Sequence, residues 1–149
     1  MYITCLDLEG VLVPEIWIAF AEESGIPELK RTTRDEPDYD KLMKWRIGVL
    51  KEHGLGLKEI QETIAKIDPL PGAKEFLDKL RKECQVIIIS DTFTQFAGPL
   101  MEKLGQPTIF CNSLEVAANG EITGFKMRVE NSKLTTVKAL QSIGYDTIA

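Results

Sequence analysis

The distribution of apolar positions predicts an α/β fold. A short apolar run occupies residues 2–6, and continuous apolar runs occupy residues 85–89 and 108–111. Continuous runs are typical of parallel strands that helices cover on both faces. Helical patterns are expected over about 73–81, 93–104 and 133–142, with a further strand starting near Asp146. The alternation of strands and helices predicts a doubly wound parallel sheet.

Residues 14–68 break this alternation. They contain three amphipathic helical patterns, at about 15–24, 39–53 and 57–66, and no predicted strand. Prolines and Gly72 punctuate both edges, as expected of connecting segments. We therefore expect a helical cap at 14–68, inserted into an α/β core formed by 1–13 and 69–149.

A β-hairpin is expected between residues 112 and 129. Two alternating segments flank Asn119-Gly120 there, which is a strong signal for a type I′ turn. The helix that follows is expected to be capped by Asn131 or Ser132.

Composition restricts the classes of function. The chain has 149 residues, is 44% hydrophobic, and carries 18 basic and 23 acidic residues, for a net charge of -5. One core domain is expected, and the acidic balance argues against nucleic-acid and anionic-membrane partners. No apolar run approaches the ~20 residues that span a bilayer, so we expect a cytoplasmic protein that binds a small molecule. Its three cysteines are expected to be reduced.

Candidate chemistry lies at the ends of the predicted strands. Asp7 and Glu9 follow the first strand, and residues two apart on an extended segment point the same way. Their carboxylates can converge where open α/β sheets bind ligands, and could hold a metal and a phosphate. Ser90 and the backbone N–H of Asp91 can donate to phosphate oxygens at the next strand end, helped by the following helix dipole. Lys133 can supply positive charge.

Each of these patterns also has an ordinary explanation when taken alone. Two carboxylates at a strand end can simply be solvated, Ser90-Asp91-Thr92 can be a helix cap, and Lys133 can be a surface lysine. The hypothesis of a phosphate site rests on the combination of these patterns and on their order along the chain.

The order and context of Asp7-Leu8-Glu9-Gly10-Val11, Ser90-Asp91-Thr92, Lys133 and the strand ending at Ala149 resemble the haloacid dehalogenase (HAD) superfamily. Within it, the chain resembles the phosphoserine phosphatases, and especially the bifunctional phosphoserine phosphatase/homoserine phosphotransferase branch, whose first motif is similar to DLEGVLVPEIW. The resemblance covers essentially the whole chain. It implies a HAD-like, Rossmannoid sheet and a Mg²⁺-dependent hydrolase of serine biosynthesis, with homoserine transfer linking it to threonine biosynthesis.

The resemblance also implies roles around the phosphate. Asp7 would be the nucleophile that becomes an aspartyl phosphate, and Glu9 the acid and base, where most of the superfamily has aspartate. Ser90, Asp91 and Lys133 would bind the phosphate. Mg²⁺ would be held by Asp7 and the backbone carbonyl of Glu9.

In the cap, the resemblance implies that Glu15 contacts the ammonium group of L-phosphoserine and that Arg46 contacts its carboxylate. A carboxylate suits an ammonium group, and a guanidinium suits a carboxylate. Taken alone, each residue is an ordinary charge on a helix surface.

The family's fourth motif carries a magnesium-binding aspartate and would follow Ala149, so the resemblance implies a C-terminal truncation with the last strands missing. Three functions stay open. The first is phosphoserine hydrolysis, with or without transfer to homoserine. The second is hydrolysis of another small phosphomonoester. The third is a catalytically impaired fragment that acts as a binding or interaction module. A homodimer also stays open.

Overall fold

The computed structural model describes all 149 residues and contains one five-stranded sheet with the order β4-β3-β2-β1-β5. The strands are β1 (Tyr2–Leu6), β2 (Gln85–Phe93), β3 (Thr108–Val116), β4 (Ile122–Lys126) and β5 (Asp146–Ile148). Neighbouring strands are parallel except for the β3–β4 pair, which is antiparallel. The predicted α/β fold with a mainly parallel sheet is confirmed.

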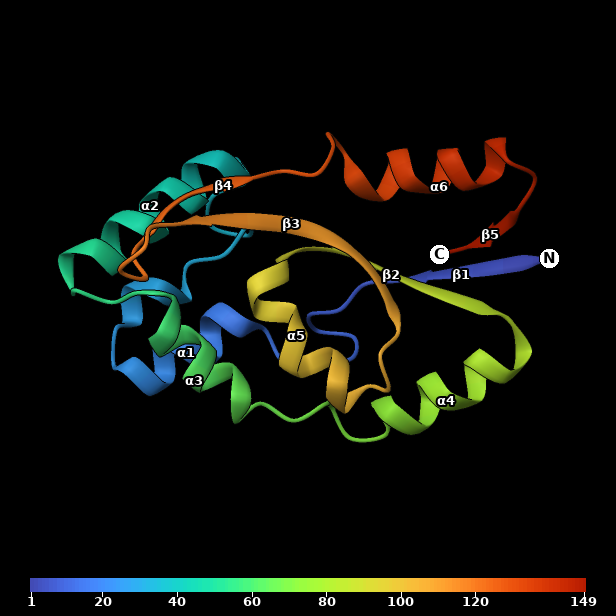
Figure 1. The fold of residues 1–149 in the computed structure, drawn as a ribbon, viewed down its shortest axis with the longest axis horizontal. Coiled ribbons are helices and arrows are strands. Elements are labelled where there is room, and N and C mark those ends of the chain that lie inside the picture. The colour runs from blue at the N-terminus through green and yellow to red at the C-terminus, as the bar shows by residue number, and fades with distance from the viewer.

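Helices cover both faces of the sheet (Figure 1). Helices α4 (Ala73–Glu83) and α5 (Thr94–Lys103) lie on one face, and α6 (Ser132–Ser142) lies on the other. Side chains of β2 alternate between them: Val86 and Ile88 belong to the main core, whereas Ile89 belongs to a smaller cluster under α6. Because both faces are covered, the strand needs apolar side chains at successive positions.

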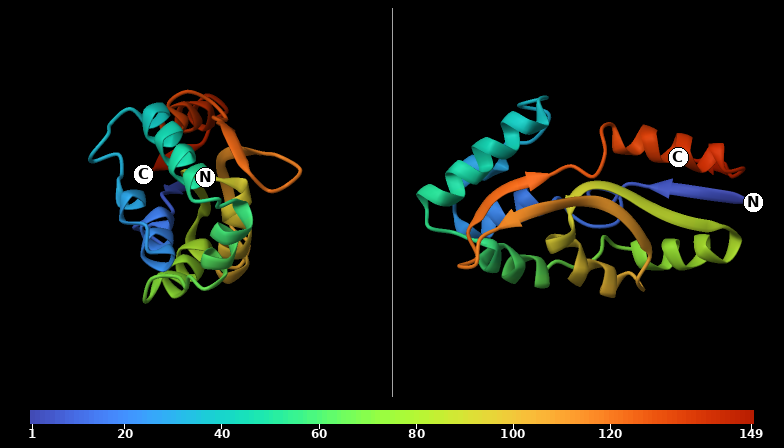
Figure 2. Two further views of the ribbon diagram at one scale, coloured as in Figure 1. Left: turned by 90° about the vertical axis from the view of Figure 1, so that its left-hand side faces the viewer. Right: turned by 45° about the horizontal axis from the view of Figure 1, so that its top comes forward.

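The segment between β1 and α4 is helical. It contains α1 (Ile16–Ser24), the 3₁₀ helix η1 (Pro27–Lys30), α2 (Tyr39–Glu52) and α3 (Leu57–Ala65). These helices gather at the end of the molecule opposite the chain termini (Figures 1 and 2). The two connecting segments lie side by side, since the Leu70 N–H donates to the Leu12 carbonyl at 2.8 Å. The division into a core and a cap at 13/14 and 68/69 stays a prediction.

The main hydrophobic core runs from the helical segment into the sheet. It comprises 27 buried residues that include Trp17 of α1, Ile60 of α3 and Phe96 of α5. The helices are therefore packed against α5 and the sheet rather than around a core of their own.

The expected hairpin is formed by β3 and β4, but its turn differs from the prediction. The Ala117 N–H donates to the Glu121 carbonyl at 2.9 Å, which leaves three residues in the loop. Gly120 has φ 90°, whereas Asn119 does not have the positive φ that a type I′ turn requires. The type I′ prediction is wrong because the loop holds one residue more than that turn allows.

The hairpin is anchored to the helical segment. The Leu57 N–H at the start of α3 donates to the Gly120 carbonyl at 2.9 Å. Near the other end of β4, the rings of Tyr39 and Phe125 meet edge to face with centroids 6.2 Å apart. Two contacts at separate points therefore fix the hairpin against α2 and α3.

Two further details depart from the sequence expectations. Strand β2 continues to Phe93 instead of ending at residue 89. Asn131 precedes α6 with φ 45° and makes no side-chain cap hydrogen bond, and the Ser132 hydroxyl is buried without a partner, so the predicted side-chain cap is absent. The three cysteines are free thiols. None of the helices combines the length and the apolar character needed to cross a membrane.

Candidate active site

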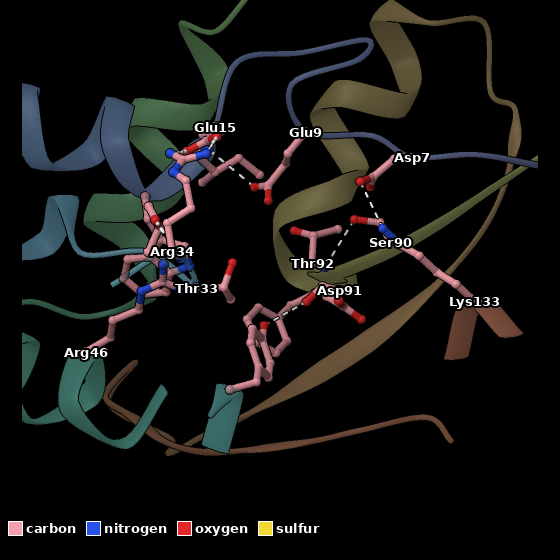
Figure 3. A pocket seen from close by; sticks show the side chains of 15 residues that line it. Asp7, Glu9, Glu15, Thr33, Arg34, Arg46, Ser90, Asp91, Thr92 and Lys133 are labelled. Atoms are coloured by element: carbon pink, nitrogen blue, oxygen red, sulfur yellow. Dashed lines mark hydrogen bonds and ion pairs between the residues drawn. The ribbon is translucent and has the colours of Figure 1, made fainter. Parts of the chain in front are cut away.

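A cavity of about 220 Å³ lies where the carboxyl ends of β1 and β2 face the helical segment (Figure 3). It is lined by 15 residues. They include all of the site residues predicted from the sequence: Asp7, Glu9, Glu15, Arg46, Ser90, Asp91 and Lys133. The structure thus brings the seven residues together, while their roles stay predictions.

Asp7 directly follows β1 and is held by two donors. The Lys133 ammonium group lies 2.9 Å from one carboxylate oxygen, and the Leu8 N–H donates to the other at 2.8 Å. Lys133 comes from the first turn of α6, so this contact joins residues 126 positions apart. A carboxylate with a cation beside it forms a surface that can accept a phosphate group.

Glu9 lines the same cavity as Asp7, while Leu8 between them is fully buried in the core. One Glu9 oxygen accepts a hydrogen bond from the Ile16 N–H at 3.3 Å, at the start of α1. Burial raises the pKa of Glu9 to about 7, although the Ile16 N–H and the charge of Arg46 act in the opposite direction. A carboxyl group that titrates near neutral pH suits both general-acid and general-base catalysis.

The Ser90-Asp91-Thr92 segment projects from an irregularity in the sheet. The register between β2 and β3 shifts between Ile89 and Phe93, and such irregularities often re-aim side chains beside active sites. The Ser90 oxygen accepts from the Thr92 N–H at 3.1 Å, which leaves its hydroxyl proton available to a ligand. The Thr92 hydroxyl lines the cavity and is buried without a partner.

The helix that follows this segment begins one residue later than expected. Strand β2 continues to Phe93 and α5 begins at Thr94, so Ser90 and Asp91 precede the helix, and the assistance of its dipole to these donors stays a prediction. The Asp91 carbonyl accepts from the Tyr39 hydroxyl at 2.8 Å, which braces the segment against α2.

Arg46 is a buried cation at the other end of the cavity. It is only 6% exposed, and its guanidinium lies over the Trp17 ring, 4.8 Å from the centroid. One of its nitrogens donates to the Arg31 carbonyl at 3.0 Å, and Nε has no partner. It makes no salt bridge with a carboxylate. Glu9 and Glu15 act on Arg46 through their charge but do not pair with it directly. A buried cation without a direct ion pair is costly, so this geometry favours an anionic ligand group beside Arg46.

Glu15 faces the same end of the cavity and is paired with a residue that the sequence did not single out. Arg34 directs its two terminal nitrogens at the two Glu15 oxygens, each at 3.4 Å. Arg34 lies in the loop between η1 and α2, where no periodic pattern or motif marks it. Trp17 packs on Phe96 and also supports Arg46.

The donor set for a metal ion is limited. No group of three or more His, Cys, Asp or Glu side chains converges anywhere in the chain. The Asp7 carboxylate and the Glu9 backbone carbonyl are the donors that the resemblance assigns to Mg²⁺. Mg²⁺ is commonly held by one or two carboxylates, with waters and substrate phosphate completing its shell, and the residues present fit such a partly hydrated ion.

Comparisons with known proteins show the family of the chain. The family model for haloacid dehalogenase-like hydrolases matches residues 17–146. The chain is 56% identical over 149 residues to phosphoserine phosphatase ThrH of Pseudomonas aeruginosa, covering all of this chain and 73% of that protein. It is 52% identical over 147 residues to a phosphoserine phosphatase of Pseudomonas syringae pv. tomato, covering 99% of this chain and 62% of that protein.

Solved structures show that the fold is shared. A structure described as a phospho-aspartyl intermediate analogue of phosphoserine phosphatase superposes with a TM-score of 0.78 at 26% identity, covering 97% of this chain and 75% of that one. A substrate-bound phosphoserine phosphatase complex superposes with a TM-score of 0.77 at 24% identity, covering 97% and 74%.

Proposed function

Because the chain belongs to the haloacid dehalogenase-like hydrolase family, we propose that it hydrolyses L-phosphoserine through an aspartyl phosphate on Asp7. One observation carries the proposal. The buried Arg46, which has no carboxylate partner, shares a cavity with the Asp7–Lys133 pair. The cavity therefore offers one place for a phosphate and another for a carboxylate, the two anionic groups of phosphoserine.

The two ends of the cavity match the two ends of this substrate. Figure 3 shows Asp7, Ser90 and Lys133 together on one side, and Glu15 and Arg46 together on the other. In the proposed complex, Ser90 and Lys133 hold the phosphate oxygens, Arg46 holds the carboxylate and Glu15 holds the ammonium group. Charge-assisted hydrogen bonds of this kind are stronger than neutral ones and fix the substrate's orientation.

Glu9 lies between the two ends, where the bond to serine must break. An Asp7 oxygen attacks phosphorus, the bond from phosphorus to the serine oxygen breaks, and that oxygen takes the proton of Glu9. Water then attacks phosphorus and gives a proton back to Glu9, while the bond from phosphorus to Asp7 breaks and phosphate leaves. A Glu9 pKa of about 7 allows the same carboxyl group to donate in the first step and accept in the second.

We further propose Mg²⁺ as the cofactor, held by Asp7 and the Glu9 carbonyl. When bound, the ion would neutralise phosphate charge and so make attack by a carboxylate easier. Lys133 contributes to the same neutralisation from α6.

The test is phosphate release from L-phosphoserine with Mg²⁺ by the chain and by Asp7→Asn. Asparagine keeps the shape of the side chain but removes the nucleophile, so we expect a loss of about 10³-fold or more. Removing Mg²⁺ with a chelator should also abolish release. Asp68→Asn is a matched control, because Asp68 is 86% exposed at a surface ion pair.

A folded chain that releases no phosphate from phosphoserine would contradict the proposal. It would favour the alternative of a catalytically impaired binding module. Release that survives in Asp7→Asn would contradict the aspartyl-phosphate route instead.

A second activity, transfer of the phosphate from phosphoserine to homoserine, is favoured by Glu9. This residue replaces the usual aspartate, and its carboxylate is tied to the Ile16 N–H at the start of α1. We propose that the longer side chain of Glu9 allows an alcohol to compete with water as the phosphate acceptor.

Glu9→Asp tests this second activity. The shorter side chain withdraws from Ile16, so the ratio of phosphohomoserine formed to phosphate released should fall when both acceptors are present. The measurement is the ratio of the two products from the same reaction mixture. An unchanged ratio would show that the length of Glu9 does not govern the choice of acceptor.

A further inference from the structure

Arg34 is the one cation of the cavity that the proposed substrate does not need. Lys133 and Arg46 already match the phosphate and the carboxylate of phosphoserine. Arg34 instead pairs with Glu15, the residue proposed for the ammonium group, with both nitrogen–oxygen distances at 3.4 Å. A guanidinium therefore stands where a substrate cation is expected (Figure 3).

The backbone around Arg34 is held by a local turn. The Arg34 N–H donates to the Thr32 hydroxyl at 3.3 Å, and the Thr32 N–H donates to the Asp35 carboxylate at 3.0 Å. The Arg34 side chain is 72% exposed, and Glu15 is the only group to which it donates a hydrogen bond. The turn thus presents the side chain to Glu15, while leaving it free to swing into solvent.

We propose that Arg34 is a specificity-determining residue that pairs with Glu15 at the ammonium subsite and is displaced by the ammonium group of the substrate. This inference rests on the proposed phosphoserine activity and adds to it. Arg34 neutralises Glu15 when no ammonium group is bound, and it competes with substrates that carry one.

The selectivity of the cavity follows from this competition. A phosphate ester with a hydroxyl in place of the ammonium group can bind while the Glu15–Arg34 pair stays intact. Without Arg34, the same ester meets the bare Glu15 carboxylate and is repelled. Removing Arg34 should therefore strengthen binding of phosphoserine and weaken binding of the hydroxyl analogue.

The exposure of the Glu15–Arg34 ion pair to solvent limits how much Arg34 can change substrate binding. Exposed ion pairs are weak, so we expect phosphoserine to bind about two- to fivefold more tightly to Arg34→Gln. The preference for phosphoserine over 3-phospho-L-glycerate, its hydroxyl analogue of the same configuration, should rise by a larger factor because the two effects act in opposite directions.

The experiment measures dissociation constants of both compounds by calorimetry on an Asp7→Asn background, which does not depend on turnover. Arg34→Gln is compared with Arg31→Gln, which removes the same charge from the same loop but lies outside the cavity lining. Arg31 holds Arg46 through its backbone carbonyl, which glutamine retains. The preference should rise in Arg34→Gln and stay within twofold in Arg31→Gln.

Four results would overturn the inference. Equal changes for both compounds would show that Arg34 acts only as a general positive charge. Weaker binding of phosphoserine with unchanged binding of O-phosphoethanolamine, which lacks the carboxylate, would place Arg34 on the substrate carboxylate instead. Failure of phosphoserine to bind when Arg34 is intact would overturn the proposed substrate along with the inference, whereas binding that Arg34→Gln leaves unchanged would overturn the inference alone.

Discussion

At the scale of single residues, the burial of Glu9 links its proposed chemistry to the stability of the fold. Folding removes this carboxyl group from water, and its pKa rises from 4.5 to about 7. The folded protein therefore binds a proton at Glu9 more tightly than the unfolded chain does. Stability contributed by this proton is fully present below about pH 4.5 and is lost as the pH rises through 7.

Glu9→Gln should accordingly stabilise the protein at high pH. Glutamine carries no charge to desolvate, so the gain in unfolding free energy should be close to zero at pH 4.5 and reach up to about 3 kcal/mol at pH 8. Urea denaturation at the two pH values measures it. Glu75→Gln, at a side chain that is 72% exposed, is the control. A gain that does not depend on pH would show that folding does not shift the pKa of Glu9.

The contrast between Glu9 and Arg34 shows which site residues sequence reasoning can find. Asp7 and Glu9 follow an apolar strand, so alternation alone places them on the same side of the chain. Arg34 lies in an irregular loop, and its contact with Glu15 depends on how the loop folds back. The burial of Arg46 was equally hidden, because the ring of Trp17 that covers it comes from a different helix.

At the scale of elements, the hairpin is a brace for α2, which lines the cavity, and for its neighbour α3. Its tip meets the start of α3 so closely that a Cβ atom on Gly56 would lie 2.6 Å from the Gly120 carbonyl oxygen. The Asn119-Gly120 signal predicted a hairpin but not this contact, since a turn motif carries no information about what its tip touches. The turn type was missed for a related reason, because the dipeptide does not reveal how many residues the loop contains.

Gly56→Ala should therefore destabilise the protein. The added methyl group collides with backbone, which cannot move aside as a flexible side chain does, and we expect a cost of about 1–3 kcal/mol. Gly48→Ala is the matched control, because its Cβ would meet nothing within 4 Å inside α2, and alanine there should stabilise by up to ~1 kcal/mol. Chemical denaturation of both variants tests the pair, and equal effects would rule out a close hairpin contact.

At the scale of the whole molecule, the cavity is assembled from segments that are distant in the sequence. Residues from the end of β1, the loop before α2, the end of β2 and the start of α6 all line it. The apolar pattern predicted these strands and helices, because burial on both faces leaves a clear signal. The apolar pattern did not predict the order of the strands in the sheet. It indicates that a strand is buried, but not which strand lies beside it.

A ligand that contacts all of these segments should stabilise the whole fold. For Asp7→Asn, phosphoserine at a hundred times its dissociation constant should add about 2.7 kcal/mol to the unfolding free energy and raise the melting temperature. Glycerol phosphate at the same concentration should raise it less, since it offers nothing to Arg46. Equal shifts for the two compounds would show that only the phosphate end of the cavity is used.

The contact between Asp7 and Lys133, 126 residues apart, has a consequence for protein synthesis. A ribosome makes the chain from its N-terminus at about 5–20 residues per second, so the proposed nucleophile is made well before its cation. Strand β1 pairs in the sheet with β2 and β5, and both follow it in the chain by tens of residues. A nascent chain stalled before α6 would hold every other residue proposed here for the reaction but lack Lys133, so its phosphate binding should be weak until α6 has been made and has packed beside β1.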